Sequence, residues 1–348
     1  MNDFALRNKT FKKILVVNVN WLGDVIFSSP LFRALKSHFP GCHISCLAPP
    51  RVQAVLECIP DIDEKMVLDE KGEHGSFVAK CQLIWEIRQK RFDAVFLLHR
   101  SMTRAFLVWM AGIPVRVGYD LKNRGAFLSH RISPLTKWVH RLDYYLNVME
   151  ALALPVVDRT TYLQTPEGAR QRMVERLNHL GIKRTDYLVV IHAGGNWDLK
   201  RWPSRYFSKL VDRLHLEYQA QVILTGTEHD VALVKEISSG SSYQPFILAG
   251  QTDLHELMAV MELANLVISA DSGPLHIAHS LGKNCIALFG PTRPEVTGPR
   301  GKGQLIILQK DVGCNRNPCY HLLCHDNICM QSITVDDVIK GIQQLKNK

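Results

Sequence analysis

Short apolar runs rich in β-branched residues alternate with helical segments along the chain, and this alternation restricts the possible folds more than any other feature. The first run, residues 14–19, is predicted to be a buried strand, and residues 25–38 follow as a helix that ends at Pro40-Gly41. Strands that alternate with helices form mostly parallel sheets with helices on both faces. The sequence therefore predicts an α/β fold.

The alternation is interrupted once, which divides the chain into two halves. Strands are predicted at residues 14–19, 43–47, 65–68, 94–98 and 115–118, and again at 187–191, 221–225, 246–249, 266–269, 285–289 and 305–308. Residues 154–166 carry prolines near both ends and are interpreted as a linker. We expect an N-terminal domain over 1–165, a C-terminal domain over 166–334, and a terminal helix within 335–348.

Polar clusters follow several predicted strands. They are Asn20–Asp24, His192–Lys200, Gly226–Glu228 and Asp271–His276. In open parallel sheets, ligands bind at the carboxyl ends of the strands. The shared position of these clusters predicts a ligand site in each half more firmly than any single motif does.

The stretch around Asp271-Ser272-Gly273-Pro274 joins a strand to a helix. Asp271 and Ser272 are residue types that cap helices, and Pro274 suits a first turn. The free N–H groups and positive dipole end of such a helix can bind a diphosphate, with His276 nearby. An ordinary capped turn explains the same residues.

Cations crowd the segment between Arg116 and Arg141, which has weak periodicity and one acid, Asp120. They are Arg116, Lys122, Arg124, Arg131, Lys137 and Arg141. We interpret the segment as a long basic loop, because such loops in compact domains are often functional. A solvated basic surface is the alternative.

The composition indicates a globular protein with anionic partners. The formal charge is +9, with 46% hydrophobic and 22% charged residues. Nucleic acid, phosphorylated small molecules and acidic membranes all fit this charge. No apolar run is long enough to span a membrane, and residues 1–13 lack an apolar signal core, so a cytoplasmic location is expected.

The nine cysteines suit a reducing compartment, and four of them recur every five residues at Cys314, Cys319, Cys324 and Cys329. Four thiols so close together could bind zinc or an iron–sulfur cluster, but they lack the C-x-x-C spacing of structural zinc sites. We expect no metal and favour packing in a loop. P-loop, G-x-G-x-x-G, G-x-S-x-G and H-E-x-x-H motifs are absent.

Several motifs together resemble a known family. They are Trp21-Leu22-Gly23-Asp24 with Pro30-Leu31, His192-Ala193-Gly194 through Lys200-Arg201-Trp202-Pro203, Asp271-Ser272-Gly273 with His276, and Gly290-Pro291-Thr292. In this order the chain resembles glycosyltransferase family 9, the ADP-heptose:lipopolysaccharide heptosyltransferases. The Trp-Leu-Gly-Asp and Lys-Arg-Trp-Pro forms are most similar to heptosyltransferase II.

The resemblance implies a GT-B fold, with two Rossmann-like parallel-sheet domains facing across a cleft. It implies inverting transfer of heptose from ADP-L-glycero-D-manno-heptose to the inner core of lipopolysaccharide, at the cytoplasmic face of the inner membrane and without a cofactor. The N-terminal half would bind the acceptor and the C-terminal half the donor. The final helix of such proteins commonly crosses back to the N-terminal half.

The resemblance also assigns roles to individual residues. Asp24 would be the general base, and its alternative role is to cap the helix at Val25. Lys200 would neutralise the leaving diphosphate, and Glu228 would bind the ribose. The expected donor-binding residues are Gly194, Gly195, Asn196, Glu228, Asp271, Ser272, Gly273 and His276, and the expected acceptor-binding cations are Lys122, Arg124 and Arg131. Gly194-Gly195 replaces hydroxyl residues of many relatives, so contacts to phosphate there would come from the backbone.

Other functions stay open on the sequence alone. A relative could use a protein or a surface polysaccharide as acceptor, and other GT-B enzymes are nucleotide-sugar epimerases or hydrolases. Asp24 in the acceptor half argues against the latter two. A nucleic-acid-binding module is not expected, because the chain shows no stripe of interleaved basic and aromatic residues.

Overall fold

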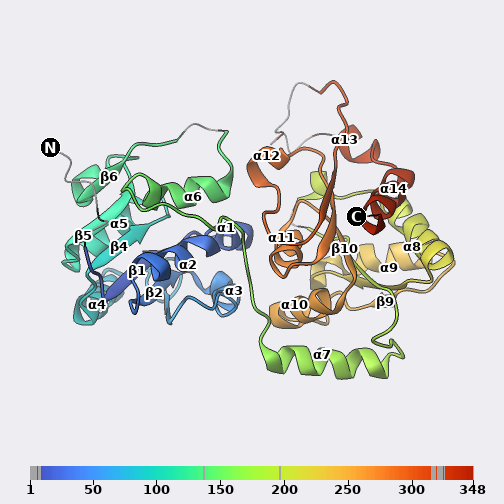
Figure 1. Ribbon diagram of the computed structural model, residues 1–348, viewed down its shortest axis with the longest axis horizontal. Coiled ribbons are helices and arrows are strands. Elements are labelled where there is room, and N and C mark those ends of the chain that lie inside the picture. The colour runs from blue at the N-terminus through green and yellow to red at the C-terminus, as the bar shows by residue number, and fades with distance from the viewer. Residues whose placement is uncertain are drawn as a thin grey trace. The chain divides into compact units, whose positions relative to one another are not determined.

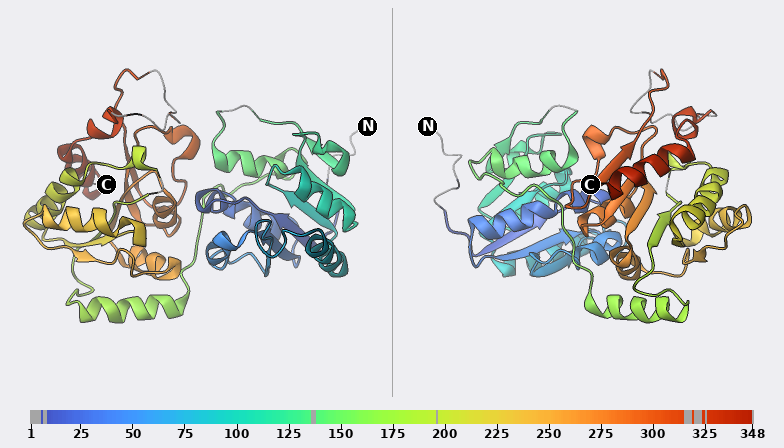
Figure 2. Two further views of the ribbon diagram at one scale, coloured as in Figure 1. Left: turned by 180° about the vertical axis from the view of Figure 1, so that it is seen from behind. Right: turned by 45° about the vertical axis from the view of Figure 1, so that its right-hand side comes forward.

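The protein, described here by a computed structural model, folds as two compact units, Met1–Leu163 and Gln164–Lys348. The structure describes residues 6, 9–135, 138–195, 197–314, 319, 324 and 326–347. Each unit contains one six-stranded parallel sheet with helices on both faces (Figures 1 and 2). The predicted parallel α/β architecture is confirmed.

The first sheet has the strand order β3-β2-β1-β4-β5-β6. Its strands are β1 (Lys13–Val17), β2 (His43–Ala48), β3 (Glu64–Val67), β4 (Ala94–Leu97), β5 (Val115–Tyr119) and β6 (His130–Ile132). In the register of the central strands, Ile14 of β1 lies opposite Ile44 and Ala94. The strand order reverses between β1 and β4, so the chain leaves these neighbouring strands toward opposite faces.

The second sheet repeats this arrangement with the order β12-β11-β10-β7-β8-β9. Its strands are β7 (Leu188–His192), β8 (Gln221–Thr225), β9 (Phe246–Ile247), β10 (Leu266–Ala270), β11 (Asn284–Leu288) and β12 (Leu305–Leu308). Here the order reverses between β7 and β10. Ligands of doubly wound sheets bind in the crevice at such a reversal point.

Helices connect the strands in both units. In the first they are α1 (Leu22–Phe27), α2 (Ser29–His38), η1 (Pro50–Val52), α3 (Gln53–Leu56), α4 (Phe77–Lys90), α5 (Met102–Met110), η2 (Arg124–Phe127) and α6 (Arg141–Glu150). In the second they are α7 (Glu167–His179), η3 (Asp198–Lys200), α8 (Ser204–Tyr218), η4 (Glu228–Asp230), α9 (Val231–Ser239), α10 (Leu254–Leu263), α11 (Gly273–Ser280), α12 (Pro294–Thr297), α13 (Ile328–Gln331) and α14 (Val335–Lys346). Among the described residues, no helix is both long and apolar enough to cross a bilayer.

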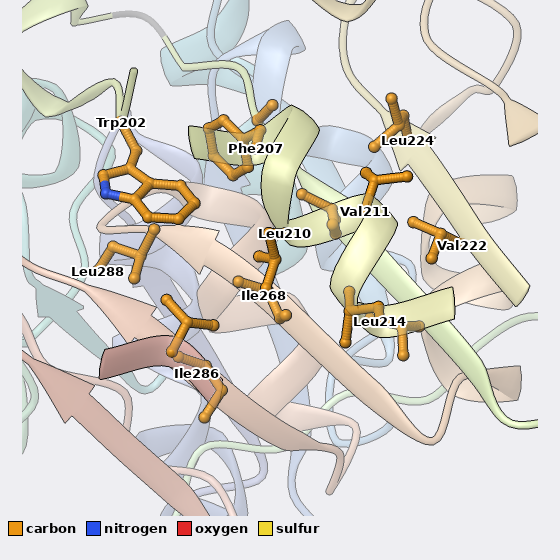
Figure 3. Packing of buried hydrophobic residues seen from close by; sticks show 14 of the residues in the cluster. Trp202, Phe207, Leu210, Val211, Leu214, Val222, Leu224, Ile268, Ile286 and Leu288 are labelled. Atoms are coloured by element: carbon orange, nitrogen blue, oxygen red, sulfur yellow. The ribbon is translucent and has the colours of Figure 1, made fainter. Parts of the chain in front are cut away.

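The core of the second unit lies between its sheet and the helices α8 and α14. Figure 3 shows Phe207, Leu210 and Leu214 of α8 directed at apolar side chains of the strands, and all three are fully buried. Nearby, the Trp202 indole N–H donates a 2.8 Å hydrogen bond to the Ile333 carbonyl. Burial of these side chains fixes the start of α8, and with it the loop that precedes it.

The terminal helix α14 belongs to this core. Val338, Ile339 and Ile342 are buried in the same cluster, and α14 contacts β11, β12 and α8. The apolar face of this helix is thus used by its own unit, and a crossing back to the N-terminal half stays a prediction.

Three local features of the first unit differ from expectation. The helix predicted over 25–38 is two helices, because Pro30 lacks the N–H that would continue the ladder, and Ser28 Oγ instead bonds the Val25 carbonyl at 2.7 Å. Beyond the expected strand β5, the basic segment contains η2 and β6 rather than one long loop. The predicted linker is anchored to the first unit in part, since Tyr162 N donates to Ser29 Oγ at 3.2 Å.

Candidate active site

An ion pair with a buried carboxylate joins the two loops at the reversal point of the second unit. Lys200 ends the turn η3 after β7, and Asp271 directly follows β10. The Lys200 ammonium lies 2.7 Å from Asp271 Oδ2 and donates a second bond of 3.1 Å to the Asp271 carbonyl. Because β7 and β10 are parallel neighbours, the sheet brings together two residues that are 71 positions apart.

Asp271 is held as a charged group within a shell of donors. Its side chain is 4% exposed, and Oδ2 also accepts a 2.7 Å hydrogen bond from the Thr292 hydroxyl. His276 Nε2 lies 3.6 Å from Oδ1. Burial raises the pKa of Asp271, but the contact with His276 and the charge of Lys200 outweigh it and hold the pKa well below its usual range. The carboxylate is therefore ionised at neutral pH.

Helix α11 begins beside this ion pair. Ser272 is its N-cap residue in extended conformation, yet its side chain makes no capping hydrogen bond and Ser272 Oγ instead contacts Ser269 Oγ at 3.1 Å. Asp271, which the sequence suggested as a cap, is directed at Lys200 and Thr292 instead. The start of α11 thus keeps uncapped N–H groups next to a cation, an arrangement that suits an anion.

The loop after β7 is organised around Asp230, a residue that the sequence did not single out. Asp230 Oδ2 accepts from the Thr227 N–H at 2.9 Å, and Oδ1 lies 3.4 Å from Arg201. A Cβ at Gly194 would collide with this carboxylate, whereas a Cβ at Gly195 would meet nothing within 4 Å. Gly194 is thus required by packing, and Gly195 faces open space. Asn196 lies outside the described residues.

Glu228 lies at the carboxyl end of β8, next to β7 in the sheet. It is exposed at the first position of η4, a turn that Thr227 and Asp230 hold by a capping box. Within the described part of the chain its carboxylate has no hydrogen-bond partner, so it is available to a ligand.

In the first unit, a side chain from a helix that is far away in the sequence holds the Asp24 carboxylate in position. Tyr145 of α6 donates a 2.9 Å hydrogen bond from its hydroxyl to Asp24 Oδ1. Burial of Tyr145 raises its pKa well above the ordinary value, and the charge of Asp24 adds to this, so the phenol stays protonated. Asp24 is the third residue of α1, whose N-cap residue is Trp21, so the reading of Asp24 as the cap is wrong.

Asn20 and His99 meet at the carboxyl ends of β1 and β4. The His99 Nδ1 accepts a 3.1 Å hydrogen bond from the Ser101 N–H, and burial lowers the pKa of His99 to about 4, helped by Arg104. The neutral ring must carry its proton on Nε2, which lies 3.1 Å from the Asn20 side-chain amide. The Nε2–H group needs an acceptor, so the Asn20 amide oxygen must face it. The Asn20 NH2 group then occupies the other amide position, which is buried and has no hydrogen-bond partner among the described residues.

The three expected acceptor-binding cations do not share one environment. Lys122 and Arg131 are exposed, whereas Arg124 is fully buried. The Arg124 Nε donates to the Tyr119 carbonyl at 2.7 Å, and its Nη1 donates to the His99 carbonyl. Arg124 is thus a structural residue that joins the loops after β4 and β5, and its assignment to an exposed acceptor platform is wrong.

Four cysteines line one cavity of about 410 Å³ in the second unit. They are Cys314, Cys319, Cys324 and Cys329. Burial raises the pKa of Cys329, which disfavours a thiolate. Within the described residues, no three His, Cys, Asp or Glu side chains form a group that could hold a metal ion. The expectation that these thiols bind no metal stays a prediction from the sequence.

Comparison with known proteins agrees with this geometry. The chain is 28% identical over 300 residues to lipopolysaccharide heptosyltransferase 2 of Salmonella typhimurium, which covers 82% of this chain and 85% of the relative. A family 9 glycosyltransferase from Veillonella parvula matches the structure with a TM-score of 0.86, 28% identity and 99% coverage of both chains. Heptosyltransferase II of Escherichia coli matches with a TM-score of 0.78 and 24% identity, over 96% of this chain and 98% of that chain.

These structural matches show that the two sheets form a GT-B fold. The model of glycosyltransferase family 9 (heptosyltransferase) matches residues 81–325, which is more than half of the chain. The chain therefore belongs to glycosyltransferase family 9, the heptosyltransferases.

Proposed function

We propose that the protein transfers heptose from ADP-L-glycero-D-manno-heptose to the inner core of lipopolysaccharide, with inversion at the anomeric carbon. The observation that carries the proposal is the presence of two separate polar centres, one in each unit. A cation stands beside an uncapped helix start at Lys200 and α11, and a positioned carboxylate stands at Asp24. Inverting transfer needs both: charge stabilisation for the leaving diphosphate and a base for the acceptor hydroxyl.

The second unit supplies the donor site in this proposal. The N–H groups of Ser272 and Gly273 would bind diphosphate oxygens, and Lys200 would neutralise the charge that develops as ADP leaves. Asp271 would hold Lys200 in position through its 2.7 Å contact, while His276 contributes a further donor. Glu228, which is exposed one strand away, would accept hydrogen bonds from the ribose hydroxyls.

The first unit supplies the base. Of the two Asp24 carboxylate oxygens, only Oδ1 has a hydrogen-bond partner among the described residues, namely Tyr145. Oδ2 is thus free to accept the proton of the acceptor hydroxyl. Because base and leaving group act on opposite faces of the sugar, their supply from different units fits an inverting reaction.

The relatives support the choice of substrates. One is named lipopolysaccharide heptosyltransferase 2 and another ADP-heptose lipopolysaccharide heptosyltransferase II. An anionic, lipid-borne acceptor also suits the charge of +9 and a peripheral place on the cytoplasmic face of the inner membrane.

A deletion strain tests the proposal. Mass spectrometry of its lipopolysaccharide should show a core truncated at heptose, and a plasmid carrying the wild-type gene should restore the full core. The Asp24→Asn gene should fail to restore it at an equal protein level. An intact core in the deletion strain would contradict the lipopolysaccharide acceptor and favour another one.

A further inference from the structure

We propose that the outer face of α4 and α5 in the first unit docks on the surface of an anionic lipid bilayer. This "aromatic face" consists of Phe77, Val78 and Trp85 on α4 and of Met102, Phe106, Trp109 and Met110 on α5. This docking surface deepens the proposed function. It rests on that function for one step, because a membrane is chosen as the partner on the ground that the proposed acceptor is a lipid.

Helix α5 is apolar on both of its faces. Ala105, Leu107 and Val108 are buried in the core of the first unit. The outward positions Met102, Phe106, Trp109 and Met110 are nevertheless 49%, 39%, 43% and 44% exposed. A helix on the surface of a soluble domain ordinarily carries polar residues at such positions, so this face is built to meet another apolar surface.

Helix α4 extends the same pattern. Leu83 and Ile87 are directed into the core, while Phe77, Val78 and Trp85 are 81%, 65% and 65% exposed. The two helices contact each other, and their buried side chains belong to one core cluster on the same face of the first sheet. Their exposed side chains therefore form one surface rather than scattered apolar residues.

The aromatic face continues into the basic segment. Phe127 of η2 packs with Phe106 and Trp109, with ring centroids 5.4 Å and 5.6 Å apart, and Phe106 and Trp109 are 5.8 Å apart. Exposed Lys122 and Arg131 flank η2 in the sequence. The aromatic cluster thus adjoins the segment that carries these cations.

The positive charge around the aromatic face favours an anionic membrane as its partner. The exposed cations of the two helices and of the loops beside them are Lys71, Arg88, Arg91, Arg100 and Lys122, with Arg131 on β6. The exposed acids of the same helices and loops are Glu73, Glu86 and Asp120, so cations are in excess, and the stretches 102–110 and 124–127 contain no acid. Tryptophan and phenylalanine with neighbouring lysine and arginine are typical of surfaces that enter the headgroup region of anionic membranes. A second copy of the same positively charged face would be repelled.

The position of the aromatic face suits a lipid acceptor. Helices α4 and α5 lead into the next parallel strands, so their first residues, Phe77 and Met102, lie toward the carboxyl edge of the sheet. Asp24 lies at the same edge, after β1. A bilayer bound by these helix starts would present a lipid-anchored sugar to the edge that holds the base.

Co-flotation with vesicles tests the proposal. The probes are phosphatidylcholine vesicles with and without phosphatidylglycerol, and the test variant is Phe77→Ser/Trp85→Ser/Met102→Ser. The wild type should float with the anionic vesicles and much less with the neutral ones. The triple variant should lose about tenfold or more in binding to the anionic vesicles. The control Val157→Ser/Leu216→Ser, at sites that are 95% and 78% exposed and belong to neither α4 nor α5, should bind like the wild type.

Tryptophan fluorescence gives a second readout, in which the variant Trp85→Phe/Trp109→Phe separates the signal of this face from that of Trp21 and Trp138, which are 60% and 49% exposed. Brominated lipids in anionic vesicles should quench Trp85 and Trp109, which are exposed. Equal flotation of the triple variant and the wild type, or no quenching, would overturn the proposal. So would a wild type that ignores vesicles but dimerises through this face in sedimentation. Vesicle binding that depends on the face, in a protein that transfers no heptose, would instead refute the proposed function and leave the docking surface standing.

Discussion

The ammonium of Lys200 lies 2.7 Å from Oδ2 of Asp271, so the cation expected to bind phosphate is already paired with a buried carboxylate. The pair positions Lys200, which is 24% exposed, but it also cancels much of its charge. A bound diphosphate would therefore share Lys200 with Asp271 and take its remaining stabilisation from the start of α11. This relationship predicts two roles for Lys200, one in stability and one in catalysis, which can be separated by experiment.

Lys200→Ala should lower kcat/KM by roughly 30- to 1,000-fold, the effect of losing about 2–4 kcal/mol of charge stabilisation in the transition state. Lys200→Arg should restore only part of this, because a planar fork cannot reproduce the two bonds of the ammonium to Asp271 Oδ2 and the Asp271 carbonyl. Steady-state kinetics with both substrates varied would measure these changes in kcat/KM. Lys209→Ala, at an exposed site of α8, is the control, and an active Lys200→Ala enzyme would remove Lys200 from the mechanism.

The stability of Lys200→Ala should depend on pH in a defined direction. The native pKa of Asp271 is lowered below its ordinary value of 3.8, so its charged form stabilises the fold above about pH 4 and this contribution is lost as the pH falls. Without Lys200, the carboxylate stays buried and less well compensated, at a cost of roughly 3 kcal/mol near pH 7. Thermal unfolding should thus show a gap between wild type and variant at pH 7 that narrows toward pH 3. A gap independent of pH would place the effect elsewhere.

Asp24→Asn should reduce kcat by roughly 10²–10⁴ while the Kd for ADP stays unchanged, because it removes the base and leaves the second unit intact. The amide oxygen can still accept from Tyr145, so folding should be kept. Asp336→Asn, which changes an exposed acid in the first turn of α14, controls for the effect of a helix N-terminal charge. Kinetics within about threefold of the wild type would mean that Asp24 only serves the helix.

Tyr145→Phe should lower kcat by roughly 10- to 100-fold, since it removes a hydrogen bond to a charged group that orients the base. The KM for the donor should not change. In the double variant Asp24→Asn/Tyr145→Phe, the Tyr145→Phe substitution should cause almost no further loss of kcat, because no base is left for Tyr145 to orient. Additive losses in this double-mutant cycle would show that Tyr145 acts only through packing.

The acceptor cations should separate into two classes. Lys122→Asn/Arg131→Gln should raise the KM for acceptor at low salt, leave the KM for donor unchanged, and lose its effect at high salt, because exposed charges are screened. Arg124→Gln should instead lower the melting temperature, since it breaks the buried bond to the Tyr119 carbonyl. Kinetics and thermal unfolding of the same preparations would check both. An unchanged acceptor KM in the double variant would exclude Lys122 and Arg131 from acceptor binding.

Local patterns in the sequence were sufficient for most of the fold. Apolar runs such as residues 266–269 and 285–289 are strands in the structure, and the polar clusters lie at the strand ends as expected. Short or interrupted elements were missed for physical reasons. The three residues of β6 lie in a charged segment without periodicity, and Pro30 divides a helix whose apolar pattern is continuous.

Local sequence patterns could not predict the contacts between residues that are far apart in the sequence. The sequence singled out Lys200 and Asp271 separately, but their pairing depends on the order of strands β7 and β10. Tyr145 is 121 positions from Asp24, and helical periodicity indicates that it is buried without indicating its partner. Arg124 was misplaced because arginine is ordinarily exposed, and here backbone carbonyls accept from its Nε and Nη1 in a buried position.

The most direct test of the account is transfer by the purified protein from ADP-L-glycero-D-manno-heptose to heptose-deficient lipopolysaccharide, followed by mass spectrometry and NMR of the product. We expect one added heptose of inverted anomeric configuration for each ADP released, and no ADP release without acceptor. Product with retained configuration would contradict Asp24 as the base of an inverting reaction. Rapid release of ADP or epimerised donor without acceptor would contradict the transferase assignment itself.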